Sequence, residues 1–261
     1  MAAALLLAGG VAALVVTVRH SSAGTQHVRT PSFAAEAGRL PRPERPALTV
    51  ARPRLLSRGE TSARVAPVLR AVAARRAPSR EARVVAPLQL ETSEGTTNIV
   101  LVIGERKRPD GPWVHVRLPV LPNDRTGWVP RRVLGGYEFV HTHLVVDRSR
   151  LRATLFRDGR RVFAAPVGVG AVASPTPAGR FYVRDRLSGF GDPFYGPVAF
   201  GTSARSAVLT DWPDGGFVGI HGTNEPGLLP GRVSHGCIRL RNPDILRLSR
   251  LMPVGTPVTI R

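Results

Sequence analysis

The stretch Ser234-His235-Gly236-Cys237-Ile238-Arg239 holds the only cysteine of the 261-residue chain. A further histidine, His221, lies upstream in Gly219-Ile220-His221-Gly222-Thr223-Asn224. A single thiol, a histidine able to reach it in space and glycine beside both predict a site for nucleophilic catalysis. One cysteine also excludes an intrachain disulfide and any metal site built from several cysteines.

The composition of the chain favours β structure and anionic partners. The 27 glycines and 24 prolines indicate turns and short strands rather than a helical bundle. The formal net charge of +19 favours anionic partners in general, which include nucleic acid, phospholipid headgroups and acidic wall polymers. Because this charge is spread along the chain and the N-terminus resembles an export signal, we expect no nucleic-acid partner.

The first 23 residues are predicted to direct export. Residues 1–18 carry no charged side chain and are mostly Ala, Leu and Val, which suits either a signal peptide or a membrane anchor. The small residues Ser21-Ser22-Ala23 suit cleavage, whereas Arg19 after the apolar core weakly opposes an external C-terminus. The sequence is compatible with a cleaved signal peptide and with a retained membrane anchor. Either places the protein at the extracytoplasmic face of the membrane or in the wall.

Residues 24–81 are interpreted as a disordered linker rich in Pro, Ala and Arg. Val65, Val68, Leu69 and Val72 have helical spacing, but Pro67 falls inside the run, so any helix there is expected to be short. A plain spacer is favoured, and a basic tether to an anionic wall polymer or lipid surface is the alternative.

Residues 82–136 predict a small β module. Apolar runs at 84–88, 99–103 and 113–118 are separated by turn-forming Gly, Pro, Asn and Asp. The block closes on Gly127-Trp128-Val129-Pro130 and resembles a bacterial SH3-like barrel. Trp113 and Trp128 either fill its core, which is favoured, or form a ligand-binding face.

Residues 139–261 predict a second, mainly β domain. Apolar alternation on both sides of Asp158-Gly159 indicates a hairpin. Asn242-Pro243-Asp244 predicts the start of one short helix, with Asn242 as its N-cap. Gly255 to Ile260 ends the chain as a strand. A β-sandwich or barrel is therefore expected.

Two segments carry a specific resemblance. His221-Gly222-Thr223-Asn224 and the stretch from Ser234 to Asn242 resemble the YkuD-type L,D-transpeptidase family of peptidoglycan enzymes. Residues 166–170, 176–181 and 255–258 support it. The resemblance implies a β-sandwich with one short helix after the cysteine, and a cleft holding that cysteine. It implies no metal and no organic cofactor.

The chemistry expected of Cys237 is acyl transfer through a thioester. His235 and His221 are both candidates for the base, and the residues alone do not choose between them. The resemblance favours His221 as general base and acid, held by the backbone carbonyl of Gly222, and leaves His235 to shape the cysteine loop. The N–H groups around Gly236 are expected to stabilise the oxyanion.

Four further residues are candidate substrate contacts. The resemblance implies that Arg239 pairs with a carboxylate of the peptide stem, although a surface arginine is nearly as good an interpretation. Tyr195 and Trp212 either line the cleft or pack in the core, and Thr223 follows the histidine motif directly.

The resemblance implies a reaction on peptidoglycan stem peptides. We expect the protein to act as a monomer, and the sequence leaves the oligomeric state open. Cys237 would attack the L-centre carbonyl of the third residue of a donor tetrapeptide and release D-alanine. An acceptor amine would then give a 3→3 cross-link, whereas water would give carboxypeptidase trimming. A catalytically silent wall-binding scaffold and a cysteine peptidase acting on proteins are the alternatives.

Overall fold

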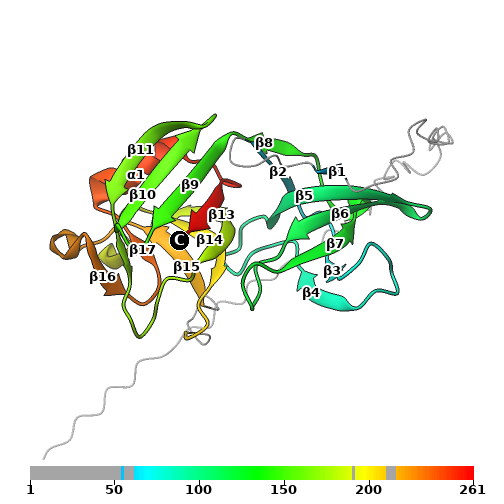
Figure 1. Cartoon of the computed structure of the whole chain (residues 1–261), viewed down its shortest axis with the longest axis horizontal. Helices are drawn as coiled ribbons and strands as arrows, with labels where there is room; N and C mark the ends of the chain where they lie inside the picture. The colour runs from blue at the N-terminus through cyan, green and yellow to red at the C-terminus, as the bar shows by residue number, and fades with distance from the viewer. Residues whose placement is uncertain (1–53, 56–61, 190–191, 210–215) are drawn as a thin grey trace, which may run out of the picture. The chain divides into compact units, whose positions relative to one another are not determined.

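The computed structural model describes residues 54–55, 62–189, 192–209 and 216–261 (Figure 1). Over these residues the chain forms two β-sheets and one α-helix, α1 (Asn242–Leu251), which confirms the mainly β prediction. The predicted leader, most of the predicted linker and Trp212 lie outside the described residues. Among the residues that are described, no helix has the length and apolarity needed to cross a membrane.

The first sheet runs in the order β4-β3-β7-β6-β5-β2-β8, with β1 paired to β5. Its strands are β1 (Arg54–Leu55), β2 (Ala63–Pro67), β3 (Val72–Arg75), β4 (Val84–Leu88), β5 (Ile99–Arg108), β6 (Gly111–Arg117), β7 (Thr126–Pro130) and β8 (Glu138–Val140). The 3-10 turn η1 (Arg131–Val133) joins β7 to β8. Their inward valines and leucines form one core.

The two tryptophans of this sheet have different surroundings. Trp113 is 1% exposed and its indole Nε1 donates to the Asp110 carboxylate at 3.2 Å, so the core interpretation holds for it. Trp128 is half-buried and stacks on His115, with ring centroids 4.7 Å apart. The likeness to an SH3-like barrel stays a prediction.

The prediction of a linker reaching residue 81 is wrong at its C-terminal end. Residues 63–67 form strand β2, which pairs with β5. Residues 72–75 form strand β3, which pairs with β4 and β7. The short helix considered for this segment is also absent from the described residues there. Val65 is buried against Leu101, its partner in β5, because an apolar run of this length suits a strand once a partner strand is available.

The module also extends past residue 136. Strand β8 pairs with β2, in register from Ala63 opposite Val140, so this sheet ends at Val140 rather than at the predicted boundary. The second sheet then starts with β9 at Thr142.

The second sheet follows the order β11-β10-β9-β18-β13-β14-β15-β17-β12-β16. Its strands are β9 (Thr142–Asp147), β10 (Arg152–Arg157), β11 (Arg160–Pro166), β12 (Gly168–Gly170), β13 (Gly179–Ser188), β14 (Val198–Arg205), β15 (Phe217–His221), β16 (Gly231–Ser234), β17 (Ile238–Arg239) and β18 (Pro257–Ile260). The predicted hairpin is confirmed: β10 and β11 are antiparallel, and Asp158 and Gly159 both have positive φ, as a tight primed turn requires.

Strand β13 joins the two halves of this sheet. Its first residues pair with β18, whereas the residues from Val183 onward pair with β14. The two halves share one hydrophobic core, to which β9–β15, β17, β18 and helix α1 all contribute. Within that core, Ile245 and Leu248 of α1 are fully buried, so the helix packs one apolar face into it.

Direct contacts join the two sheets within one compact unit. Tyr182 of β13 is fully buried, and its hydroxyl donates to the Ile99 carbonyl at 3.1 Å. The Asn123 side chain donates to the Arg205 carbonyl at 2.8 Å and accepts from the Arg205 N–H at 2.9 Å. These bonds hold β5 and the loop between β6 and β7 against β13 and β14.

A buried carboxyl at this junction predicts a pH-dependent stability. Asp185 is 2% exposed, and burial, reinforced by the nearby Glu94 carboxylate, raises its pKa to about 6. Between its ordinary value and pH 6 the folded state binds a proton that the unfolded state has lost, so the free energy of unfolding falls as the pH rises. A shift of this size corresponds to about 3 kcal/mol at most.

We therefore expect Asp185→Asn to stabilise the protein at pH 7.5 by about 1–3 kcal/mol and to remove the decline between pH 4 and 6. The asparagine oxygen still accepts the Gly201 N–H that Asp185 Oδ1 accepts at 2.8 Å. Urea unfolding at several pH values measures this effect, with the exposed Asp158→Asn as control. Parallel pH curves for wild type and Asp185→Asn would contradict it.

Candidate active site

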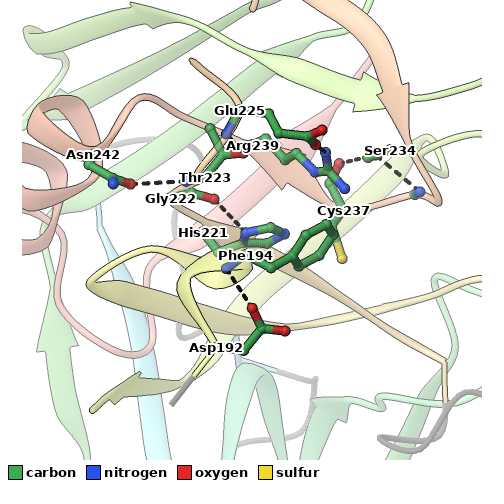
Figure 2. Close-up of polar contacts among 11 residues, drawn as sticks. Asp192, Phe194, His221, Gly222, Thr223, Glu225, Ser234, Cys237, Arg239 and Asn242 are labelled. Atoms are coloured by element: carbon green, nitrogen blue, oxygen red, sulfur yellow. Dashed lines mark hydrogen bonds and ion pairs between the residues drawn. The ribbon is translucent and has the colours of Figure 1, made fainter. Parts of the chain in front are cut away.

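The parallel pairing of β15 with β17 brings the predicted cysteine and histidine segments together. Ile220 lies opposite Ile238, and His221 lies opposite Arg239. Cys237 directly precedes β17, and the Gly219 N–H of β15 points at its Sγ at 3.4 Å. Figure 2 shows the thiol and the His221 imidazole in the same part of the site. Cys237 is partly exposed, as a nucleophile must be.

His221 is held in one tautomer by the backbone. Its ring is buried at 1% exposure, and Nδ1 lies 2.6 Å from the Gly222 carbonyl oxygen. Because a carbonyl only accepts, Nδ1 carries the proton and donates it, which leaves the Nε2 lone pair as an acceptor. Nε2 is buried and has no hydrogen-bond partner among the described residues. The sequence-based expectation that Gly222 orients this ring agrees with the contact.

Burial also keeps this imidazole neutral. It lowers the pKa of His221 to about 4, against the opposing effect of the Gly222 hydrogen bond and with a smaller contribution from the Arg239 charge. The ring is therefore uncharged at neutral pH, and its Nε2 lone pair can accept a proton, as general-base catalysis requires.

Two aromatic side chains enclose the imidazole. They come from the 3-10 turn η2 (Pro193–Tyr195), which Asp192 caps by accepting the Phe194 N–H at 2.8 Å. The ring centroids of Tyr195 and Phe194 lie 5.2 and 5.9 Å from that of His221. Tyr195 also lines the pocket, so the structure places it at the cleft rather than in the core.

Arg239 is buried beside the ring of Phe194. Its guanidinium stands 4.4 Å from the Phe194 centroid, and Nη1 lies 3.2 Å from Glu225 Oε2. The arginine side chain is 5% exposed, whereas that of Glu225 is 50% exposed. The interpretation of Arg239 as an ordinary surface arginine is therefore wrong. Figure 2 shows this pair above the Cys237 side chain.

Ser234 braces the loop that bears the cysteine. Its Oγ donates to the Cys237 carbonyl at 2.5 Å and accepts the Gly236 N–H at 3.1 Å. Gly236 has φ +120°, a conformation that a residue with a Cβ rarely adopts. The Gly236 N–H is thus engaged with Ser234, and its predicted contribution to an oxyanion hole stays a prediction. His235, next to it, is exposed and lines the pocket.

The turn after His221 corrects one expectation about Asn242. Its side-chain oxygen accepts the Thr223 N–H at 2.9 Å and does not cap helix α1, whose capping position is Arg241. A Cβ on Gly222 would lie 2.3 Å from that oxygen, so the turn requires glycine. Thr223 is buried, and its hydroxyl accepts the Glu225 N–H at 3.0 Å rather than facing the pocket.

A pocket of about 470 Å³ opens over the cysteine. Among the predicted site residues it is lined by Cys237, His221, His235, Gly236, Arg239 and Tyr195. Glu94 of the first sheet also contributes to its wall. Within the described segments, no three His, Cys, Asp or Glu side chains gather in a way that would hold a metal ion.

Sequence reasoning missed several residues of the site. Phe194, Gly219, Ser234 and Glu225 all contact a predicted site residue. Ser234 had a local signal, because a hydroxyl two residues before glycine in a tight loop often bonds the backbone. Phe194 and Glu225 are brought in by tertiary pairing and had none.

Comparisons with known proteins agree with the resemblance. Residues 141–260 match the YkuD family, described as the L,D-transpeptidase catalytic domain. A Bacillus subtilis protein named as a candidate L,D-transpeptidase, YkuD, is 35% identical over 118 residues, which cover 45% of this chain and 65% of that protein. The Escherichia coli protein "Probable L,D-transpeptidase YbiS" is 31% identical over 137 residues, covering 46% and 44%.

Among solved structures, the catalytic domain from the E. faecium L,D-transpeptidase is 26% identical, with a TM-score of 0.35. The match covers 46% of this chain and 96% of that domain. This chain spans less than two thirds of the length of the two curated relatives named above. The predicted membership of the C-terminal domain in this family is confirmed.

Proposed function

Since residues 141–260 fall in the L,D-transpeptidase catalytic domain family, we propose that the chain is a peptidoglycan transpeptidase with Cys237 as nucleophile. The observation that carries the proposal is the neutral, buried His221, fixed by the Gly222 carbonyl in the pocket that holds the chain's only thiol. The donor is a tetrapeptide stem, attacked at the L-centre carbonyl of its third residue.

The first half-reaction forms a thioester. His221 Nε2 takes the thiol proton as Cys237 Sγ bonds to the donor carbonyl carbon, and an oxyanion forms. The amide bond to D-alanine then breaks, and the imidazolium returns the proton to the leaving nitrogen. The low pKa of His221 suits this return, because a weakly basic imidazole gives its proton up readily.

The second half-reaction releases the acyl group. An acceptor amine attacks the thioester carbonyl, and His221 accepts the amine proton. The C–S bond then breaks, and the imidazolium returns that proton to the sulfur, which restores the thiol. A stem side-chain amine gives a 3→3 cross-link, whereas water gives trimming to the tripeptide. Arg239 is paired with the partly exposed Glu225. A carboxylate of the stem peptide would replace the Glu225 carboxylate on the guanidinium when the donor binds.

The proposed setting is the cell wall. The chain acts as an exported monomer, anchored or secreted, and the basic N-terminal segment favours anionic wall polymers or the membrane surface. Fractionation of cells with an antibody to the protein tests this placement, and recovery in the cytoplasmic fraction would contradict it.

The activity itself is tested with purified muropeptides and mass spectrometry. We expect tetrapeptide substrates to yield dimers joined 3→3, with loss of one D-alanine per cross-link and tripeptide as the product of hydrolysis. Recovery of unchanged tetrapeptide would contradict the proposal and leave a wall-binding scaffold. Cleavage of a protein panel, without any muropeptide product, would instead support a peptidase.

A further inference from the structure

The turn that follows β12 contacts the cysteine loop through the hydroxyl group of Thr176. Thr176 is 1% exposed. Its Oγ1 accepts the Gly170 N–H at 2.8 Å and donates to the Gly236 carbonyl oxygen at 2.8 Å. Because a hydroxyl has one proton and a carbonyl has none to give, the direction of the second bond is fixed.

The backbone around this hydroxyl is closely packed. A Cβ on Gly170 would lie 2.2 Å from the Ser174 carbonyl oxygen and 2.4 Å from the Thr176 nitrogen. At Gly236 the nearest atoms to such a Cβ are the carbonyl oxygens of Ser174 and Pro175, at 3.8 and 3.9 Å. The turn therefore packs tightly on Gly170 through its own backbone and lies in van der Waals contact with the cysteine loop at Gly236.

Thr176 acts on the peptide unit that contains the nucleophile's own nitrogen. The Gly236 carbonyl and the Cys237 N–H belong to one planar trans peptide, in which the two groups point in opposite directions. Holding the carbonyl oxygen thus sets the direction of the Cys237 N–H. Ser234 holds the neighbouring groups, the Gly236 N–H and the Cys237 carbonyl, from within the loop. Thr176 holds the remaining carbonyl from outside it.

We infer that Thr176 is a positioning residue for acyl transfer. Its hydroxyl orients the Gly236–Cys237 peptide so that the Cys237 N–H faces the oxyanion, which forms on the carbonyl oxygen of the acyl group that the thiol attacks. This inference rests on the proposed acyl transfer at Cys237, and its test uses small reagents rather than a stem peptide. Misdirecting an oxyanion donor costs rate at the step that forms the oxyanion and leaves other reactions of the thiol unchanged.

Two reagents separate these effects. Acylation of Cys237 by p-nitrophenyl acetate passes through a tetrahedral oxyanion, whereas alkylation by iodoacetamide does not. We expect Thr176→Val, which keeps the shape and loses the hydroxyl, to slow acylation by about tenfold or more. Alkylation is expected to stay within twofold, and Thr176→Ser is expected to restore acylation to within threefold. The Cys237→Ala protein supplies the background of each reagent, since the chain has no other thiol.

Thr256→Val is the matched control. Thr256 is equally buried, and its hydroxyl donates to the Pro253 carbonyl at 2.7 Å, away from the cysteine loop. It should leave the ratio of the two rates unchanged. A parallel fall of both rates in Thr176→Val, or normal acylation in that variant, would overturn the inference. If the wild type fails on muropeptides while Thr176→Val still slows acylation selectively, the peptidoglycan proposal falls and the positioning inference stands.

Discussion

Cys237→Ala is expected to lower muropeptide cross-linking by about 10⁴-fold or more, to the background of the assay. Acyl transfer through a thioester requires a thiol, and no second cysteine exists to take its place. The same change removes the mass adduct that a carbapenem-type acylating agent should leave on the wild-type protein. Product analysis by mass spectrometry and intact-protein mass give the two measurements.

The alanine variant has a built-in test of folding. The Cys237 thiol accepts the Gly219 N–H at 3.4 Å, a weak sulfur contact, so its loss should change the melting temperature little. Cys237→Ser keeps an acceptor at this position and should remain folded and nearly inactive, because the less acidic hydroxyl is a poor nucleophile beside a weak base. Wild-type turnover in Cys237→Ala would assign the chemistry to another residue.

The site was predictable where its signal was local. The segments around His221 and Cys237 each carry their glycines and histidine in a short run, and the family resemblance paired them. Residues alone left His235 and His221 as equal candidates. The structure separates the two: His235 is exposed, whereas His221 is buried with one nitrogen fixed by Gly222. Burial and a tautomer depend on tertiary contacts, which no local pattern contains.

The fold was also predictable where its signal was local, and the prediction failed where tertiary pairing decides the structure. Asp158-Gly159 fixes a turn locally, and the hairpin followed. The spacing of Val65, Val68 and Val72 fits a helix as well as two strands, and only the pairing with β5 and β4 decides between them. Asn242 has a good capping residue type, yet the Thr223 N–H on a distant turn takes its oxygen.

His221→Ala is expected to lower the rate of Cys237 acylation by about 10²–10⁴-fold, the usual contribution of a general base. In the proposed mechanism this residue carries the proton in both half-reactions, from the thiol to the leaving nitrogen in the first and from the acceptor amine to the sulfur in the second. Stopped-flow acylation with a carbapenem-type agent measures the effect. His141→Ala is the control, because that imidazole is exposed and pairs with Asp158 on the surface.

The pH profile of the wild type identifies which histidine is the base. Because burial lowers the pKa of His221 to about 4, its Nε2 stays available down to that pH, and acylation should fall only as the pH drops through 4. An imidazole with an ordinary pKa would lose the reaction near 6.5. We therefore expect acylation rates at pH 5.5 and pH 7 to agree within about twofold. A limb near 6.5 in the wild type would contradict His221 as the base. A limb near 4 that disappears in His221→Ala would assign the proton transfer to Nε2 of His221, because its Nδ1 is engaged with the Gly222 carbonyl.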